Sequence, residues 1–444
     1  RLDPSDALWK CRNSLADPLN PGYGSFVKLT ALDDPTGEAA FLEFARRLHA
    51  LDGEEHRAWI LENIDVEALI DYQAVKSVIS DQDGFTKNWM LFHGTSKDAR
   101  GKTVHRWTAH PWDLDLSFGQ IELGSDELVT ESHPLTGTID HPRHGRTGTS
   151  WNGLLEAVFG RRSGDYFIKA LYGRIWSILE EKFHPQALGA KLLCIDAHTA
   201  EAAAADLERW PRWGLEPTNA TFHRERLRRY CRERHAFLRR FLTSEHPTTA
   251  SEVDPRPRSE FPDFDGRVFA PPARAWRSFR YTPAPRLKIT EVHYHPGDDE
   301  ALEFIEIRNL EASAVDISGW DLPAVGYVFP KGSEAPGGEV LVVARDPERL
   351  KARHPRLGKT RLFGPYAGRL GNSGEELRLR DGGFHQGERC FPETIDVVKY
   401  GDAPPWPREP DGGGPSLELR SAALDNDLPE SWRASAEAGG TPGA

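Results

Sequence analysis

Two aspartates at alternate positions, Asp113 and Asp115, directly follow a segment that has the character of a β-strand, 104–112. Side chains two residues apart on an extended chain point the same way, so these carboxylates would repel each other. A bound divalent cation removes that repulsion, and carboxylate oxygens suit Mg²⁺, Mn²⁺ or Ca²⁺. The pattern therefore predicts a divalent-metal site. The competing interpretation is a surface hairpin with solvated aspartates.

A second polar pair is Asp83 and Asn88. Asn88 is the first residue of another strand-like segment, 88–93, and Asp83 lies in the loop ahead of it. An aspartate five residues ahead of an asparagine has the spacing of the protein-kinase catalytic loop. In that loop the aspartate accepts the proton of the substrate hydroxyl, and the asparagine oxygen binds a divalent ion. The competing interpretation is an aspartate that caps a turn and an asparagine at the start of a strand.

A helix and a hairpin are expected to position these groups. Asp65 is a good N-cap, and the apolar stripe that follows it has helical spacing. Its members are Leu69, Ile70, Ala74, Val75, Val78 and Ile79. A charged tip, 94–102, joins the two strands. Further helices are expected at 39–51, 54–62, 154–159, 166–183, 185–209 and 222–242. The last of these carries eight arginines, Arg234 among them, which we expect on a solvated face.

The C-terminal part of the chain has a different character. Residues 244–285 are rich in proline and poor in aliphatic residues, which is typical of a semi-extended linker. Beyond them, short segments alternate with period two and are separated by turn residues, which predicts an antiparallel β-sandwich with Trp320 in its core. The expected strands are 287–294, 303–308, 338–344, 376–380 and 395–400. The chain as a whole is therefore of the α+β class.

Composition excludes some classes of protein. The formal net charge of −12 argues against a general nucleic-acid binder. No run of about 18 apolar residues is present, so we expect no membrane span, and no signal peptide is visible. The four cysteines are far apart without a C-x-x-C pair, which argues against a zinc ribbon.

The N-terminal region resembles the spore coat protein H (CotH) family of atypical kinases. The matching motifs are Ile70-Asp-Tyr-Gln-Ala-Val, Asp83-x-x-x-Lys-Asn-Trp and Trp112-Asp-Leu-Asp-Leu-Ser-Phe-Gly. The resemblance implies a kinase-like large lobe with a helical extension over residues 1–243. It also implies metal-dependent transfer of phosphate from ATP to serine hydroxyls of protein substrates. Carried over to this sequence, Asp83 is the base, Asn88 and Asp113 are metal ligands, and Asp115 is a second ligand or an orienter.

Residues 286–443 resemble the lamin-tail domain family, an immunoglobulin-like sandwich. The matching motifs include Ile289-Thr-Glu-Val-His-Tyr-His-Pro, Glu303-Phe-Ile-Glu-Ile-Arg-Asn, Val315-Asp-Ile-Ser-Gly-Trp-Asp and the ending Gly439-Gly-Thr-Pro-Gly. The resemblance implies binding or positioning and names no ligand. Bacterial domains of this family are usually accessory modules on exported proteins, so we expect an exported or cell-surface protein.

The sequence departs from the CotH pattern upstream of these motifs. We find no glycine-rich phosphate loop and no strand-borne lysine there, and we expect the nucleotide-covering small lobe to be missing from a chain that begins at Arg1. Lys10 is expected to be an ordinary surface residue. A non-catalytic pseudokinase or surface-binding scaffold that acts through the lamin-tail domain is therefore the main alternative.

Two other groups of residues could form a different kind of site. His133, His141 and His144 could join the aspartates in a metal hydrolase, although their spacing matches no helix or strand face. Ser117 follows the acidic pair but lacks the G-x-S-x-G context of a nucleophile, so a Ser/His/Asp triad is not expected.

Overall fold

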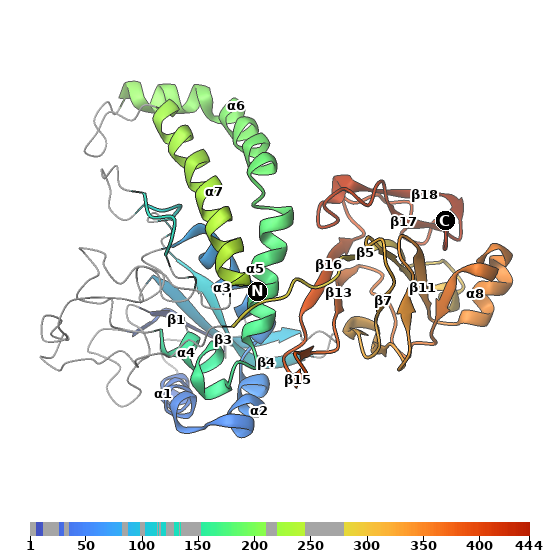
Figure 1. Ribbon diagram of the computed structural model, residues 1–444, viewed down its shortest axis with the longest axis horizontal. Coiled ribbons are helices and arrows are strands. Elements are labelled where there is room, and N and C mark those ends of the chain that lie inside the picture. The colour runs from blue at the N-terminus through green and yellow to red at the C-terminus, as the bar shows by residue number, and fades with distance from the viewer. Residues whose placement is uncertain are drawn as a thin grey trace, which may run out of the picture. The chain divides into compact units, whose positions relative to one another are not determined.

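The computed structural model describes most of the chain and divides it into two compact units. The described residues are 6–11, 26–30, 35–81, 88–97, 103–112, 114, 117–120, 128–132, 134, 152–209, 220–244 and 279–444. The N-terminal unit comprises Arg1–Ser96 and Val104–Thr282, and the C-terminal unit comprises Lys97–Thr103 and Pro283–Ala444. Helices and a sheet form the first unit, and sheets dominate the second, which confirms the expected α+β class (Figure 1).

The N-terminal unit is built on a four-stranded sheet with the order β2-β1-β3-β4. Strands β3 (Trp89–Lys97) and β4 (Thr103–Pro111) are the two strands that the sequence predicts. Strands β1 (Ala7–Cys11) and β2 (Phe26–Lys28) were not predicted. Strand β1 runs antiparallel to both of its neighbours, with Cys11 opposite Trp89.

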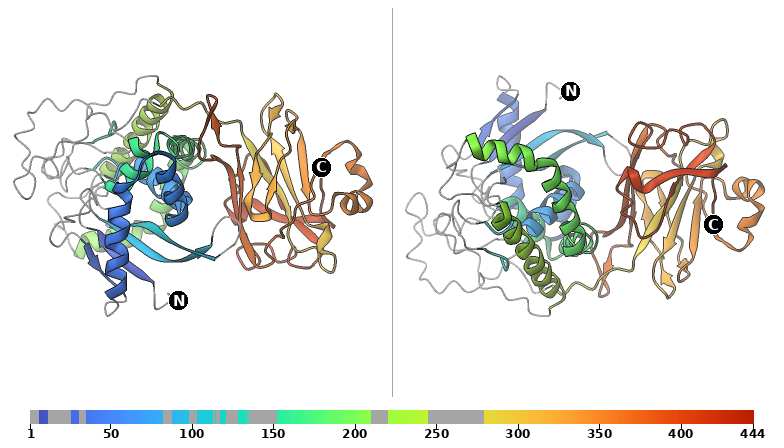
Figure 2. Two further views of the ribbon diagram at one scale, coloured as in Figure 1. Left: turned by 90° about the horizontal axis from the view of Figure 1, so that it is seen from below. Right: turned by 90° about the horizontal axis from the view of Figure 1, so that it is seen from above.

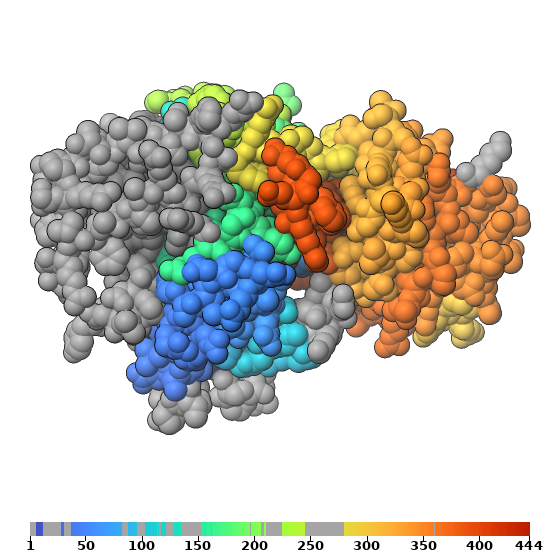
Figure 3. Space-filling model, turned by 60° about the horizontal axis from the view of Figure 1, so that its bottom comes forward, coloured from blue at the N-terminus to red at the C-terminus, as the bar shows by residue number. Residues whose placement is uncertain are grey.

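Aromatic side chains attach helix α1 (Pro35–Ala50) to one face of this sheet. Phe41 stacks on Trp9 of β1 and Phe44 stacks on Trp107 of β4, each with 4.5 Å between ring centroids. Helix α2 (Gly53–Asn63) follows, and Figure 3 shows α1 and α2, in blue, at the surface of this unit. The bulky indole and phenyl rings fill the space between helix and sheet, where they are removed from water.

Helix α3 (Val66–Ile79) begins where its sequence predicts. The Asp65 carboxylate accepts a hydrogen bond of 3.1 Å from the Ala68 amide, as an N-cap does. The predicted apolar stripe is wrong at one position, because Val75 is 48% exposed. The next residue, Lys76, is instead buried at 2% exposure.

Four further α-helices belong to the described part of the N-terminal unit. These are α4 (Gly153–Phe159), α5 (Ile168–Glu181), α6 (Pro185–Arg209) and α7 (Ala220–Thr243). Helix α5 packs on α3 and α7, and α6 packs on α7 (Figures 1 and 2). None of the helices within the described ranges combines the length and apolar character that crossing a bilayer requires.

The C-terminal unit contains two principal sheets. The larger has the order β12-β11-β6-β5-β17-β18 and the smaller has the order β16-β13-β8-β9. The strands of the larger sheet are β5 (Leu287–His293), β6 (Phe304–Asn309), β11 (Val340–Ala344), β12 (Arg361–Phe363), β17 (Pro415–Leu419) and β18 (Trp432–Ala438). Those of the smaller are β8 (Asp321–Leu322), β9 (Tyr327–Val328), β13 (Gly374–Arg380) and β16 (Thr394–Gly401). Short pairs β7 (Val315–Asp316) with β10 (Glu334–Ala335) and β14 (Phe384–His385) with β15 (Glu388–Arg389), and helix α8 (Pro347–Arg353), complete the unit.

A continuous apolar core lies between these sheets and includes Trp320, as predicted. This arrangement is consistent with the expected immunoglobulin-like sandwich. One expectation is corrected: the sandwich is not wholly antiparallel, because β11 pairs with β12 in parallel.

The outer face of strands β5 and β6 carries buried acids that a simple alternation of buried and exposed residues does not predict. Glu291 and Glu306 lie opposite each other in the register and are only 2% and 4% exposed. The end of the chain covers them: the Thr441 amide donates to Glu291 at 2.7 Å, and the Gly443 amide donates to Glu306 at 2.8 Å. Burial raises the pKa of Glu291 to about 7.

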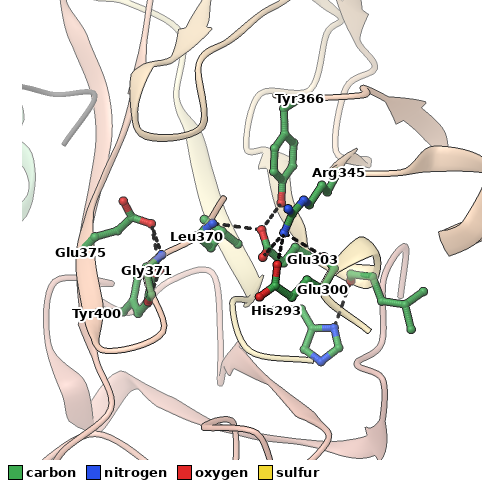
Figure 4. Close-up of polar contacts among 10 residues, drawn as sticks. His293, Glu300, Glu303, Arg345, Tyr366, Leu370, Gly371, Glu375 and Tyr400 are labelled. Atoms are coloured by element: carbon green, nitrogen blue, oxygen red, sulfur yellow. Dashed lines mark hydrogen bonds and ion pairs between the residues drawn. The ribbon is translucent and has the colours of Figure 1, made fainter. Parts of the chain in front are cut away.

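A third buried acid, Glu303, connects the start of β6 to a loop of the same unit (Figure 4). It accepts hydrogen bonds from Arg345 at 2.8 Å, from the Leu370 amide at 2.9 Å and from the Tyr366 hydroxyl at 3.3 Å. Because every donor comes from this unit, Glu303 has a structural role in the sandwich.

Candidate functional site

The predicted catalytic loop and metal site are only partly within the described residues. Asp83, Asp113 and Asp115 lie outside them, as do the three loop histidines at 133, 141 and 144. Asn88 is described, together with Trp112, the residue that immediately precedes Asp113. The geometry of the candidate site is therefore built from its flanking elements.

Asn88 and Trp112 are hydrogen-bonded neighbours at one edge of the sheet. The Trp112 amide, just after β4, donates to the carbonyl oxygen of Asn88, just before β3, over 3.2 Å. Asn88 has a left-handed φ of +58°, a conformation that asparagine adopts more readily than most residues. The two predicted motifs are thus brought together, since Asp113 is bonded to Trp112 along the chain.

Lys10 joins the same edge, which corrects the expectation of no strand-borne lysine upstream of the motifs. It is the fourth residue of β1, and its Nζ lies 4.6 Å from the centroid of the Trp112 ring. A lysine ammonium within about 6 Å of an indole face is attracted by the ring. The end of β1 therefore places a positive charge beside the residue that precedes Asp113.

The end of helix α3 lies next to the turn that follows the acidic pair. The Phe118 amide donates to the Ile79 carbonyl at 2.6 Å, and the Val129 amide donates to the Gly119 carbonyl at 3.0 Å. Gly119 has a φ of +77°, and a Cβ there would lie 2.6 Å from the Val129 carbonyl oxygen. Only glycine fits this position, so the Phe-Gly step of the motif has a clear steric basis.

Helix α7 holds these segments together through one buried arginine. Arg234 is fully buried, which corrects the expectation that the arginines of this helix form a solvated face. Its guanidinium donates to the carbonyls of Ser77, Thr130 and Ser132. It thereby joins α3 to 128–132. The spacing of the helix indicates that Arg234 is buried. It lies four residues after Tyr230 and three before Phe237, on the same helix face, and both of these side chains are buried.

A buried ion pair lies at the end of α3, just ahead of the Asp83 motif. Lys76 Nζ is 3.1 Å from Asp81 Oδ2 and 2.9 Å from the Tyr72 hydroxyl, and neither Lys76 nor Asp81 is exposed by more than 2%. Burial lowers the pKa of Lys76, but Tyr72 and Asp81 outweigh it and raise that pKa above its ordinary value. Sequence reasoning missed this pair, although Lys76 lies seven residues after Leu69 and therefore on the same helix face.

The donor chemistry of the predicted site fits a divalent cation. Carboxylates and the Asn88 amide supply hard oxygen ligands, which Mg²⁺ and Mn²⁺ prefer. Asn88 is half-buried at the sheet edge, beside the chain that leads into Asp113. Within the described ranges alone, no group of three or more histidine, cysteine, aspartate or glutamate residues could hold a metal ion.

The serine considered as a nucleophile has an unsuitable environment. Ser117 is 7% exposed, and its hydroxyl has no hydrogen-bond partner among the residues that the structure describes.

Two family models match parts of the chain. Residues 30–238 match the family model described as CotH kinase protein. Residues 281–402 match the model described as Lamin Tail Domain. Strand β1 with Lys10 lies ahead of the first match. No curated protein matches the chain significantly.

Proposed function

Because the chain carries a CotH kinase domain followed by a Lamin Tail Domain, we propose that it transfers phosphate from ATP to serine hydroxyls of proteins, with a divalent metal as cofactor. The observation that carries the proposal is the meeting of Asn88, Trp112 and Lys10 at one sheet edge, where Lys10 was not predicted to belong to the site. Asn88 is hydrogen-bonded to Trp112, and Lys10 lies over the Trp112 ring. The proposed metal ligand Asn88, the residue before Asp113 and a positive charge suited to phosphate are thus neighbours.

The proposed reaction is an in-line displacement. The substrate serine oxygen forms a bond to the γ-phosphorus of ATP while the bond from that phosphorus to the β-phosphate oxygen breaks, and ADP leaves. Asp83 accepts the hydroxyl proton. Asn88, Asp113 and Asp115 would hold Mg²⁺ or Mn²⁺, which when bound offsets the negative charge on the phosphate oxygens. Lys10 contributes a further positive charge beside Trp112, and positioning supplies much of the acceleration.

The remaining parts of the proposal concern the setting in which the reaction takes place. The protein substrates are exported or cell-surface proteins with accessible serine or threonine hydroxyls, in a bacterial source. The Lamin Tail Domain positions the kinase domain or its substrate, since it offers a stable sandwich and the resemblance attributes no chemistry to it. These statements rest on the family pairing.

Titration calorimetry tests the proposal. We expect Mn²⁺ to bind the full chain in the presence of ATP and the Asp113→Ala variant to lose that binding. Asp83→Asn should spare the binding, because Asp83 is proposed as a base and not as a ligand. Equal metal binding by the parent chain and by Asp113→Ala would contradict the site assignment. No binding by either would favour the non-catalytic scaffold.

A further inference from the structure

The buried pair Lys76 and Asp81 has no part in the proposed reaction, yet it occupies the end of the helix that leads into the Asp83 motif. Its ammonium and carboxylate atoms are 3.1 Å apart, and both side chains are shielded from water. Tyr72 lies one turn before Lys76 on α3, and its hydroxyl accepts a hydrogen bond of 2.9 Å from the ammonium. Buried Cys11 at the end of β1 also lies near Tyr72.

The energetics of this pair do not explain it as a stabilising device. An aspartate at a helix C-terminus is disfavoured by the partial negative charge of the last carbonyl groups. Taking two charges out of water is costly, and a well-packed apolar pair of similar volume is often as stable or more so. A buried ion pair does, however, fix geometry, because both partners must stay together and a slipped register leaves a buried charge unpaired.

The backbone around Asp81 is held in one conformation. Its amide donates to the Lys76 carbonyl at 3.3 Å, so both its backbone and its carboxylate are tied to Lys76. Ser80 has a left-handed φ of +50°, and its hydroxyl lies 2.6 Å from that of Ser132. The helix therefore ends at a point fixed from several sides, and Asp83 follows two residues later, at most about 7 Å along the chain.

We propose that the Lys76–Asp81 pair consists of positioning residues, which set the point where the chain leaves α3 and thereby align Asp83 with the substrate hydroxyl. This inference rests on the proposed kinase function for its effect on transfer. Its effect on the local structure does not depend on that function. Because neither residue is proposed to contact the nucleotide or the metal, the pair is expected to act on the turnover number and to leave nucleotide affinity unchanged.

The test uses a double variant, Lys76→Met with Asp81→Leu, in the full chain. Removing both charges avoids an unpaired buried charge, so the melting temperature should stay within about 3 °C of the parent value. Transfer of labelled γ-phosphate from ATP with Mn²⁺ to dephosphorylated casein should show a kcat at least about ten-fold lower with an unchanged KM for ATP. Amide hydrogen exchange of peptides spanning 78–92 should be at least about ten-fold faster.

Two further variants make the result decisive. Asp71→Asn removes another ion pair of the same helix, formed with Arg174 at 2.7 Å but far from the helix end, and should leave kcat and the exchange of 78–92 unchanged. Lys76→Gln with Asp81→Asn also removes both charges but keeps polar side chains of similar shape, and it tests the same exchange change if the first double variant does not fold.

Each outcome decides one of the two proposals. Unchanged exchange in 78–92 overturns the positioning role, whatever the transfer assay gives. Faster exchange with an unaltered kcat also overturns it. Faster exchange in a protein whose parent chain transfers no phosphate supports the structural role and removes the proposed kinase function instead.

Discussion

The buried acid Glu291 in the C-terminal unit provides a prediction whose magnitude follows from the structure. Its carboxylate accepts hydrogen bonds from Thr441 and Ser416 and faces Glu306 across the β5–β6 pair. Burial, with a smaller contribution from Glu306, raises its pKa from 4.5 to about 7. The folded protein therefore holds this proton more tightly than the unfolded chain does.

The sign of the pH dependence follows directly. The stability from this group is fully present below pH 4.5 and is lost as the pH rises through 7, because the folded state must then give up its proton. At about 1.4 kcal/mol per pKa unit, the loss between pH 5 and pH 8 is about 2.5 kcal/mol. Glu291→Gln cannot ionise, so this variant should lose that part of the pH dependence.

Pulsed hydrogen exchange along a urea titration measures the prediction in the full chain, because it reports the unfolding of β5 and β6 separately from the other unit. The free energy of unfolding of the parent should fall by about 2.5 kcal/mol more than that of Glu291→Gln between pH 5 and pH 8. Glu339→Gln, at an exposed position of the same unit, is the matched control. Identical pH dependence in the parent and Glu291→Gln would refute the reasoning.

Three further predictions concern the N-terminal unit. Arg234→Met should lower its free energy of unfolding by about 3 kcal/mol or more, because three carbonyls lose their donor. The matched variant Arg232→Met, at an exposed position, should change that free energy by less than about 0.5 kcal/mol. Urea unfolding measures both, and equal effects would contradict the account. Gly119→Ala should destabilise the same domain by about 2 kcal/mol or more in that assay because of its φ of +77° and the Val129 carbonyl, and a neutral result would argue against this turn. Lys10→Met should weaken ATP binding with Mn²⁺ about ten-fold by calorimetry, and Lys28→Met on the neighbouring strand should not; no difference between them would remove Lys10 from the site.

The long helices and the sandwich strands follow from local sequence. Helix α3 has both a capping aspartate and an apolar stripe, and each of the five strands expected in the sandwich is present. The sequence did not predict the two N-terminal strands, and this has a physical cause. Strands β1 and β2 are five and three residues long, and segments this short carry little periodic signal. Because β1 is so short, the sequence predicts Lys10 to be a surface residue.

The charged residues of the interior were harder to predict. Lys76 and Arg234 lie on helix faces that their spacing identifies as buried, whereas Glu291 lies on a strand face that a simple alternation of buried and exposed residues does not identify. In each case the burial of a charge depends on partners outside its own helix or strand. Lys76 needs Asp81 beyond the helix end, Arg234 needs carbonyls more than 100 residues away, and Glu291 needs the end of the chain. Sequence alone predicted the pairing of the Asn88 and Trp112 motifs because both flank one hairpin.

The most direct test of the central claim is phosphate transfer itself. The full chain would be incubated with γ-labelled ATP, Mn²⁺ and dephosphorylated casein, with Asp83→Asn as the variant that retains metal binding. The account predicts labelled serine from the parent chain and at least about a hundred-fold less from Asp83→Asn. Labelling that is absent from the parent, or equal in the two proteins, would contradict it.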